Sequence, residues 1–401
     1  MRHRIIIEAQ SPLAFPVRKP GDQFTESLGY VPGGVLWAAL GSQRNAIPHA
    51  RFSHALPAHN GDEWVRVLPA TAISCKRHPG FLPHPRAAGE SDMAHGVFDT
   101  LIDRSCAELL EPAALTYDPR CPNCLQRTDG YGGVYTQRDG RHETRSIQLR
   151  MLTRVAIDRM RGTAAEGLLY SPIVVSETNS FQSYDQQTQQ KNTTTEQTRF
   201  LGWAWELGAD EQAALGNVRA VGGRTSSGLG QVHITVEPDP VTATLGDRVD
   251  IFNRQFAQRW HMFASDLAPQ AAPDWHPDHV RVFTVGLQSD AILLENGWQP
   301  TMVFSSAQLE AQTGLKADLV RVQASTQIVG GWNVRWNRPK PTNIAATAGS
   351  VYLFRTDASE AEVITALEQL EAEGIGQRRA EGFGAVYCCD EFHGVVTGDV
   401  R

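Results

Sequence analysis

A short glycine-rich pattern occurs twice in this chain, and this repeat limits the possible folds more than any other feature. The first copy is GGRTSSGLGQV at Gly222–Val232, and the second is GQRRAEGFGAV at Gly376–Val386. Both copies fit G-x-R-x-x-x-G-[LF]-G-x-V and stand 154 positions apart. Glycine is favoured where the backbone needs a positive φ or where another backbone comes close. The repeat therefore predicts that one structural unit occurs twice.

The segments around the two loops match as well. The apolar run Phe200–Leu207 precedes the first loop and the run Ser350–Asp357 precedes the second, each followed by a helix-like segment and then the loop. In the second of these helices the apolar residues fall at helical spacing, and Ser359 with Glu362 is expected to form a capping box. A strand-like stretch follows each loop, so each half ends strand–helix–loop–strand. This is the second half of a ferredoxin-like βαββαβ unit.

The start of that unit is visible as well. Arg4–Glu8 is expected to be the first strand of the N-terminal half, Tyr30–Arg44 its first helix, and Val280–Leu287 the first strand of the C-terminal half. We therefore predict an α+β protein of two tandem ferredoxin-like (βαββαβ, RRM-like) domains, residues 1–240 and 241–401.

An insertion in the first domain, about residues 57–144, holds four of the six cysteines. Cys121 and Cys124 form a C-x-x-C pair, which is typical of a zinc knuckle. A structural zinc ion would stabilise a segment that shows little apolar periodicity. The alternative is four reduced thiols without a metal. The predicted zinc ligands are Cys75, Cys106, Cys121 and Cys124, with His78, His84 or His95 as a replacement for one of them.

The charge of the chain is unevenly distributed. The formal net charge is −7, which argues against a general nucleic-acid binder. Residues 319–356 nevertheless contain no Asp or Glu, and residues 138–161 contain seven arginines and have a net charge of +4. Such local basic stretches suit a protein that holds one polyanion at defined places. Solvated strand and loop faces explain them equally well.

The glycine loops themselves are candidates for phosphate binding. Glycine-rich backbone can present N–H groups to phosphate oxygens, and the arginine in each loop adds a guanidinium fork. The alternative is that the glycines only let each loop lie flat against its neighbours. Neither loop contains G-K-[ST], so a Walker-type ATP site is not expected.

Several segments resemble the RAMP superfamily of CRISPR-associated proteins: the paired loops, YVPGGVLWAAL from Tyr30, and the block Gly330–Phe354. Val155–Val175 and the cysteine-bearing insertion are similar to the Csx-ten type, the Cas-five-like subunit of type III-D effector complexes. Gly34 and Trp37 stand where the first helix of the superfamily commonly has Ser and Arg. The resemblance implies a non-catalytic subunit that holds the 5′ repeat-derived handle of the guide RNA. It also implies docking against the large polymerase-like subunit and the first backbone subunit.

The residues expected to bind RNA come from the loops, the first helix, the basic stretches and nearby aromatics that could stack bases. They are Gly33, Gly34, Arg154, Arg159, Gly222, Gly223, Arg224, Gly228, Gly230, Trp332, Lys340, Arg378, Arg379, Gly382, Phe383 and Gly384. Trp336 is a further stacking candidate. For any single aromatic residue among these, a place in the core is the alternative.

Two enzymatic alternatives remain open. Some RAMP proteins cut guide-RNA precursors without a metal and use a histidine, for which His49, His54, His59 and His142 are available. A target-cleaving subunit would need an Asp in an exposed loop together with a metal ion, with Asp92, Asp99 and Asp103 as candidates. The N-terminal MRHRIIIEAQSPLAF lacks a small-residue cleavage site, so a first strand and a cytoplasmic location are expected.

Overall fold

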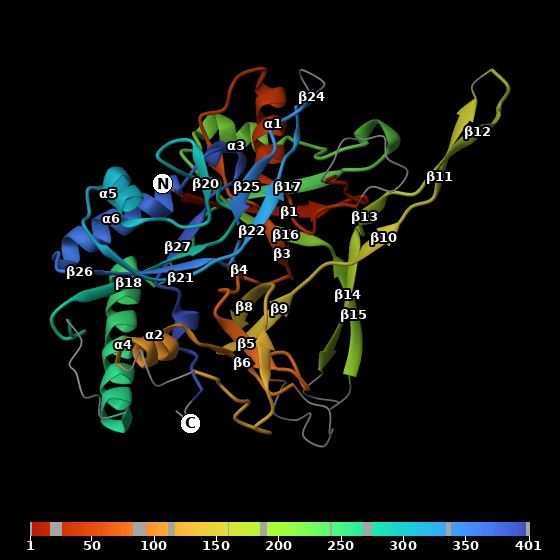
Figure 1. Ribbon diagram of the computed structural model, residues 1–401. Coiled ribbons are helices and arrows are strands. Elements are labelled where there is room, and N and C mark those ends of the chain that lie inside the picture. Colours follow the sequence, from red (N-terminus) through yellow and green to blue (C-terminus); the bar gives the residue numbers. More distant parts are fainter. Residues whose placement is uncertain are drawn as a thin grey trace.

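The computed structural model describes residues 2–16, 26–82, 94–110, 117–158, 160–184, 191–240, 243–267, 275–333 and 338–397. Within these ranges the chain is a mixed α+β protein with several antiparallel sheets and six α-helices. Two larger sheets lie at the centres of the N-terminal and C-terminal halves, and smaller sheets and hairpins surround them (Figure 1).

The N-terminal sheet has the strand order β17-β1-β16-β2, and β3 pairs with β16 beside β2. The strand β1 alternates between buried and half-exposed residues because helices cover only one face of the sheet. Leu36 and Leu40 of α1 and Leu215 of α3 pack on that face against Ile5 and Ile7. The elements are β1 (Arg2–Ala9), α1 (Gly33–Arg44), β2 (Arg51–Phe52), β3 (Leu56–Ala58), β16 (Arg199–Trp205), α3 (Ala209–Gly216) and β17 (Val232–Pro238).

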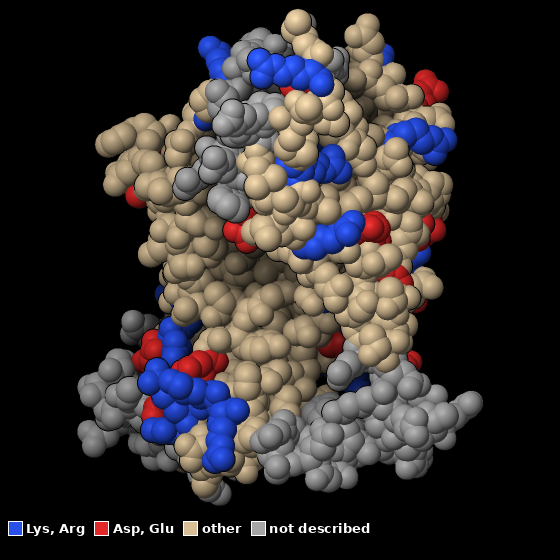
Figure 2. All heavy atoms as spheres, turned by 90° about the vertical axis from the view of Figure 1, so that its right-hand side faces the viewer, with Lys and Arg blue, Asp and Glu red and all other residues tan. Residues whose placement is uncertain are grey.

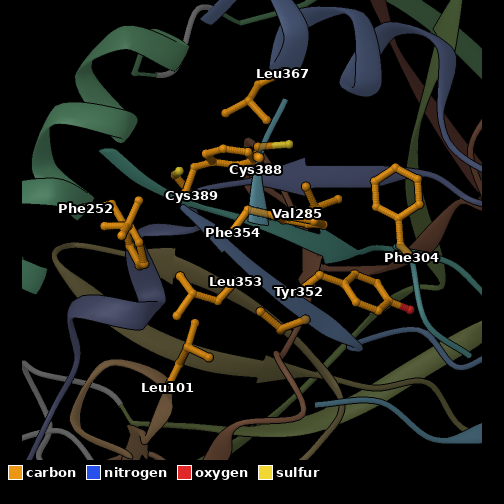
Figure 3. Close-up of a cluster of buried hydrophobic side chains, with 14 of the residues drawn as sticks. Leu101, Phe252, Val285, Phe304, Tyr352, Leu353, Phe354, Leu367, Cys388 and Cys389 are labelled. Carbon is orange, nitrogen blue, oxygen red and sulfur yellow. The ribbon is translucent and has the colours of Figure 1, made fainter. Parts of the chain in front are cut away.

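The C-terminal sheet has the order β21-β26-β18-β27. Its strand β26 is buried at nearly every position because both faces of the sheet are covered. Figure 3 shows Leu367 of α6 on one side of this sheet and Leu101 of α2 on the other. The elements are α4 (Leu245–Leu267), β18 (Arg281–Leu287), α5 (Ser306–Thr313), β21 (Asp318–Gln323), β26 (Val351–Thr356), α6 (Glu360–Glu373) and β27 (Val386–Cys388). In both sheets the first strand lies between the third and the fourth, and the second lies beyond the third.

The insertion contains two three-stranded sheets, β4-β8-β9 and β6-β5-β7, and the helix α2. It is attached to the end of the chain, since Tyr135 donates a hydrogen bond of 2.7 Å to Asp390 and Arg66 pairs with Glu391 at 2.6 Å. The elements are β4 (Arg66–Val67), β5 (Ala72–Cys75), β6 (Val97–Asp99), α2 (Leu101–Leu110), β7 (Thr128–Gly130), β8 (Val134–Arg138) and β9 (Arg141–Arg145).

The remaining strands form two-stranded hairpins or ribbons, of which β11–β12 projects farthest from the molecule (Figure 1). They are β10 (Leu149–Met151) with β13 (Ile173–Val175), β11 (Arg154–Asp158) with β12 (Thr163–Tyr170), β14 (Thr178–Tyr184) with β15 (Lys191–Gln197), β19 (Leu293–Glu295) with β20 (Gln299–Thr301), β22 (Thr326–Val329) with β25 (Asn343–Ala346), and β23 (Trp332–Asn333) with β24 (Arg338–Pro339).

The strands and helices that the sequence predicts at the start and at the end of each half are present. The capping box on α6 is confirmed, because the Ser359 side chain accepts a hydrogen bond from Glu362 N–H and the Glu362 side chain accepts one from Ser359 N–H. The helices α4 and α5 and the second strand of each sheet were not predicted from the sequence. No helix in the described part of the chain is long and apolar enough to cross a membrane.

Candidate nucleic-acid interface and metal centre

The two glycine loops have the same backbone conformation. Four positions in each loop have a positive φ, and they correspond one to one. They are Gly222, Arg224, Gly228 and Gly230 with φ of 84°, 60°, 79° and 84°, and Gly376, Arg378, Gly382 and Gly384 with φ of 73°, 56°, 93° and 69°. A 3-10 turn follows the arginine in each loop, η1 (Thr225–Ser227) and η2 (Arg379–Glu381). The sequence repeat is therefore also a structural repeat.

Each loop lies against the chain that leaves the first strand of its own half. Ala14 O accepts a hydrogen bond of 2.8 Å from Gly223 N–H, and Ile292 O accepts one of 3.0 Å from Gln377 N–H. The first glycine of each loop has no room for a side chain, because an added Cβ would lie 2.5 Å from the same carbonyl oxygen. At this position glycine is needed because a side chain would clash with the neighbouring backbone.

The outer face of the second loop is covered by the N-terminal half. A Cβ at Gly33, the first residue of α1, would lie 3.0 Å from Gly382 Cα, and a Cβ at Gly382 would lie 2.5 Å from His54 Nδ1. His54 stacks on Tyr30, meets the edge of Phe383, and accepts a hydrogen bond of 3.1 Å from Gly33 N–H. The expected phosphate donor at the start of α1 is therefore occupied by a histidine.

The cations beside the second loop are paired. Glu381 accepts from Arg378 at 2.7 Å and from Lys340 at 2.6 Å. Burial alone would raise the pKa of Glu381, but Arg378 and Lys340 lower it overall, so this carboxylate stays ionised. Arg378 also lies over the Phe383 ring, and the partly exposed Arg379 lies 3.5 Å from Glu373. The cations of the second loop are therefore engaged by carboxylates of the chain itself.

The first loop has an open outer face. Residues 225–228 are exposed, and a Cβ at Gly228 would meet nothing within 4 Å. Two residues of the projecting β11–β12 hairpin meet this loop. The guanidinium of Arg224 lies 4.7 Å from the centre of the Tyr170 ring, and Arg154 donates a hydrogen bond of 2.6 Å to Ser227 O. Two arginines, an aromatic ring and three exposed hydroxyl residues thus gather at the base of the hairpin.

The other predicted residues are spread more widely. Gly34 packs beside Glu381, where an added Cβ would lie 3.3 Å from the Glu381 Cβ. Trp332 belongs to β23 and pairs with Pro339 of β24. Arg159 and Trp336 lie outside the described residues. Tyr170 was not predicted from the sequence, although it lies in Val155–Val175, a segment that was noted for its resemblance to CRISPR-associated proteins.

Lys and Arg side chains are visible on the side of the molecule where the hairpin projects. Figure 2 looks onto this side and shows Lys and Arg over the upper half of the face and in a dense group at the lower left. Largely uncharged surface separates the two regions. The described Lys and Arg side chains on this face therefore form two separate groups.

Four side chains in the insertion form a candidate metal centre: Cys75, His95, Cys121 and Cys124. Their possible ligand atoms lie within 4.8 Å of one another, with 3.6 Å between Sγ of Cys75 and Cys124 and 3.3 Å between Cys121 Sγ and His95 Nδ1. Tetrahedral Zn²⁺ with Zn–S bonds of about 2.3 Å separates its sulfur ligands by about 3.8 Å. The donor set and its spacing therefore fit zinc.

The backbone around the cysteines favours thiolates. Burial alone would raise the pKa of Cys75, but hydrogen bonds from the backbone N–H groups of His78 and Arg77 contribute to a lower value overall. The N–H groups of Cys124 and Asn123 make the equivalent bonds to Cys121, but burial and the neighbouring Cys124 and Cys75 thiols raise the pKa of Cys121 overall. A thiolate is the form of cysteine that binds a metal.

The prediction that Cys106 completes this site is wrong. Cys106 lies on the apolar side of α2 and is fully buried in the core of the C-terminal half, where its neighbours are hydrophobic. The fourth member is His95, one of the three histidines left open by the sequence. The ring of His78 lies 4.5 Å from that of His95, and His84 is outside the described residues.

Most of the described residues that were considered for an enzyme are buried or packed against other side chains. His54 and His59 are buried, and burial lowers the pKa of each to about 4. Asp99 and Asp103 are also buried, and Asp103 pairs with Arg259 at 2.6 Å, so neither lies in an exposed loop. Asp92 lies outside the described residues. His49 is exposed, and His142 packs among aromatic rings.

Residues 270–390 match the family model described as CRISPR-associated protein (Cas_Cmr3). None of the curated proteins matches this chain. The matched region begins before the C-terminal sheet and includes the second glycine loop.

Solved structures of CRISPR complexes are similar at low identity. A chain in the cryo-EM structure of the type III-B Cmr-beta bound to cognate target RNA and AMPPnP is 10% identical, with a TM-score of 0.39, over 87% of this chain and 86% of that one. A chain of the Csm3-Csm4 subcomplex in the type III-A CRISPR-Cas interference complex is 10% identical, with a TM-score of 0.32, over 87% of this chain and 92% of that one. Since both TM-scores are below 0.5, the identification depends on the family match. Through that match, residues 270–390 of the chain are similar to a family of CRISPR-associated proteins.

Proposed function

We propose that this chain is a non-catalytic RNA-binding subunit of a type III CRISPR effector complex in the cytoplasm, and that it is of the Csx-ten, Cas-five-like type. In this proposal it holds the 5′ repeat-derived handle of the guide RNA and contacts the large polymerase-like subunit and the first backbone subunit. The family match supports the CRISPR assignment. The similar order of strands in the two main sheets supports two ferredoxin-like domains, residues 1–240 and 241–401.

The observation that best supports RNA binding is the difference between the two loops. They share a conformation, but the second is covered by α1 and the cations beside it are paired with Glu381 or Glu373. The first loop is open. The guanidinium of its Arg224 lies over the Tyr170 ring, and Arg154 donates a hydrogen bond to the carbonyl oxygen of Ser227 in the loop. A guanidinium beside an aromatic ring offers a phosphate contact together with a stacking surface. The RNA contact is therefore assigned to the first loop and the hairpin base.

The test compares the two equivalent arginines. Arg224→Ala removes a charged phosphate contact worth about 1.5–3 kcal/mol, so affinity for a guide RNA with its repeat handle should fall about 10- to 100-fold. The dependence of log affinity on log salt should also become shallower by about 0.7. Fluorescence anisotropy of the labelled guide RNA over a salt series measures both quantities.

Arg378→Ala is the matched control, because it removes the same residue from a loop that faces the protein interior. It should lower stability and leave RNA affinity of the folded protein unchanged. Equal affinity of Arg224→Ala and the wild type would contradict the assignment to the first loop. Cleavage of repeat RNA by the purified chain in EDTA would instead support a metal-independent endoribonuclease.

We also propose that Cys75, His95, Cys121 and Cys124 hold a structural Zn²⁺. A site with four protein ligands leaves no coordination position for a substrate, which is typical of structural zinc. The metal would join β5 to the segments that carry His95 and the C-x-x-C pair.

A further inference from the structure

A second group of possible metal ligands lies far from the cysteines in sequence and has different chemistry. His261 is on the last turns of α4, and His276 and Asp278 are on the turn that leads into β18. His261 Nε2 lies 3.2 Å and His276 Nδ1 3.4 Å from the same carboxylate oxygen, Asp278 Oδ2. The possible ligand atoms of all three residues lie within 4.8 Å of one another.

These separations are those of ligands that share a metal. With metal–ligand bonds of about 2.0–2.2 Å, neighbouring ligand atoms around a tetrahedral zinc ion are about 3.4 Å apart. The observed distances are long for hydrogen bonds to a carboxylate, which are usually about 2.7–2.9 Å. One carboxylate oxygen between two imidazole nitrogens thus fits a bound cation better than a pair of direct hydrogen bonds.

The turn that supplies two of these ligands is held in place. His276 O accepts a hydrogen bond of 2.9 Å from His279 N–H, and Asp278 N–H donates to His276 Nδ1 at 3.3 Å. The His276 ring also meets the edge of Trp260, which is buried in the core. The lone pair of Nδ1 that accepts this N–H is the one that a metal would take, so metal binding at that atom would replace the hydrogen bond. The backbone bond at His276 O and the contact with Trp260 nevertheless hold the His276 ring next to His261 and Asp278.

We propose that His261, His276 and Asp278 bind one divalent transition-metal ion, Zn²⁺ in particular. The three side chains are between about a third and just over half exposed, so solvent can reach the ion and complete its coordination. Three protein ligands and an open position are the arrangement of exchangeable and catalytic zinc sites. This site is independent of RNA binding by the first loop and of the cysteine site.

The experiment is equilibrium dialysis of the full chain against buffered free Zn²⁺, followed by elemental analysis. The wild type is expected to hold a second, weaker equivalent of zinc beyond that of the cysteine site. His261→Ala and Asp278→Asn should each reduce its affinity at least tenfold, while His49→Ala, at an exposed histidine elsewhere, should leave it unchanged. Circular dichroism checks that each variant is folded.

Cobalt provides the second measurement. Co²⁺ added to protein that carries zinc in the cysteine site alone should produce weak visible bands without sulfur-to-metal charge transfer, and His261→Ala should abolish them. A single zinc equivalent in the wild type under these conditions would overturn the proposal. A second equivalent that survives in both His261→Ala and Asp278→Asn would overturn it as well.

Discussion

At the scale of single residues, His54 is buried at the contact between the two halves, next to Gly33 and Gly382. Burial lowers its pKa to about 4 from an ordinary value of 6.5, and its Nδ1 accepts from Gly33 N–H. A protonated ring carries a hydrogen on Nδ1, so Nδ1 could no longer accept the hydrogen bond from Gly33 N–H. Because the folded state has the lower pKa, the unfolded chain takes up this proton first. The contribution of neutral His54 to stability is therefore full above about pH 6.5 and is lost as the pH falls toward 4.

We expect this histidine to account for part of the acid sensitivity of the protein. Between pH 7.5 and pH 5 its linkage amounts to about 2 kcal/mol of unfolding free energy. His54→Leu should be less stable at pH 7.5, because Gly33 N–H loses its acceptor, but should lose about 2 kcal/mol less on acidification. Urea unfolding at both pH values measures the difference. His49→Leu is the control, and an unchanged pH dependence in His54→Leu would contradict the prediction.

At the scale of elements, the two glycine loops are alike in conformation and differ in their surroundings. Gly228 and Gly382 occupy equivalent positions with positive φ, but a Cβ at Gly228 points into open space. A Cβ at Gly382 would come within 2.5 Å of His54 Nδ1 and 3.1 Å of Phe52 O. The same substitution in the two loops therefore separates the effect of backbone conformation from that of packing.

Gly228→Ala should cost about 1–2 kcal/mol of unfolding free energy, which is the ordinary cost of a left-handed residue with a side chain. Gly382→Ala carries the same cost and must also move His54 or the start of α1, so we expect at least twice that loss. Denaturant unfolding of the two variants at pH 7.5 gives the comparison. Equal losses would show that the second loop can move away from α1 freely.

These elements also show how far the sequence could predict the structure. The spacing of glycine and arginine predicted the repeated loops, and Ser359 with Glu362 predicted the start of α6, because both signals are local. The sequence did not indicate that His54 and Gly33 cover Gly382, since that contact joins residues more than 300 positions apart. The choice between Cys106 and His95 failed for the same reason. C-x-x-C is a local motif, whereas its partners depend on the tertiary fold.

At the scale of the whole molecule, the insertion is part of the C-terminal half as well as the N-terminal one. The buried carboxylate of Asp103 on α2 pairs with Arg259 on α4, and Asp99 lies 3.2 Å from the buried His393. The core of the C-terminal half is completed by residues of α2 such as Leu101. Damage to the insertion should therefore destabilise both halves together.

The zinc site allows this coupling to be tested. Cys121→Ser/Cys124→Ser should remove one zinc per chain and lower the unfolding temperature of the whole protein in a single transition. Cys106→Ala is the matched control, because it should keep that zinc while lowering stability through a small cavity in the core. Elemental analysis and calorimetry measure the two effects. Wild-type protein without stoichiometric zinc, and an unaltered transition in the double variant, would contradict the prediction.

The position of α2 has a consequence for synthesis of the chain. Its apolar side leaves the ribosome about 150 residues before the middle of α4, the helix against which it packs. At 5–20 residues per second, this side waits roughly 8 to 30 s for its partner. The apolar side of α2 is not fully covered until β27 and the turn at Phe392 have also been synthesised. The α2 part of the insertion therefore cannot finish folding while the N-terminal half is being translated, and nascent chains that stop before residue 390 leave part of this apolar surface exposed.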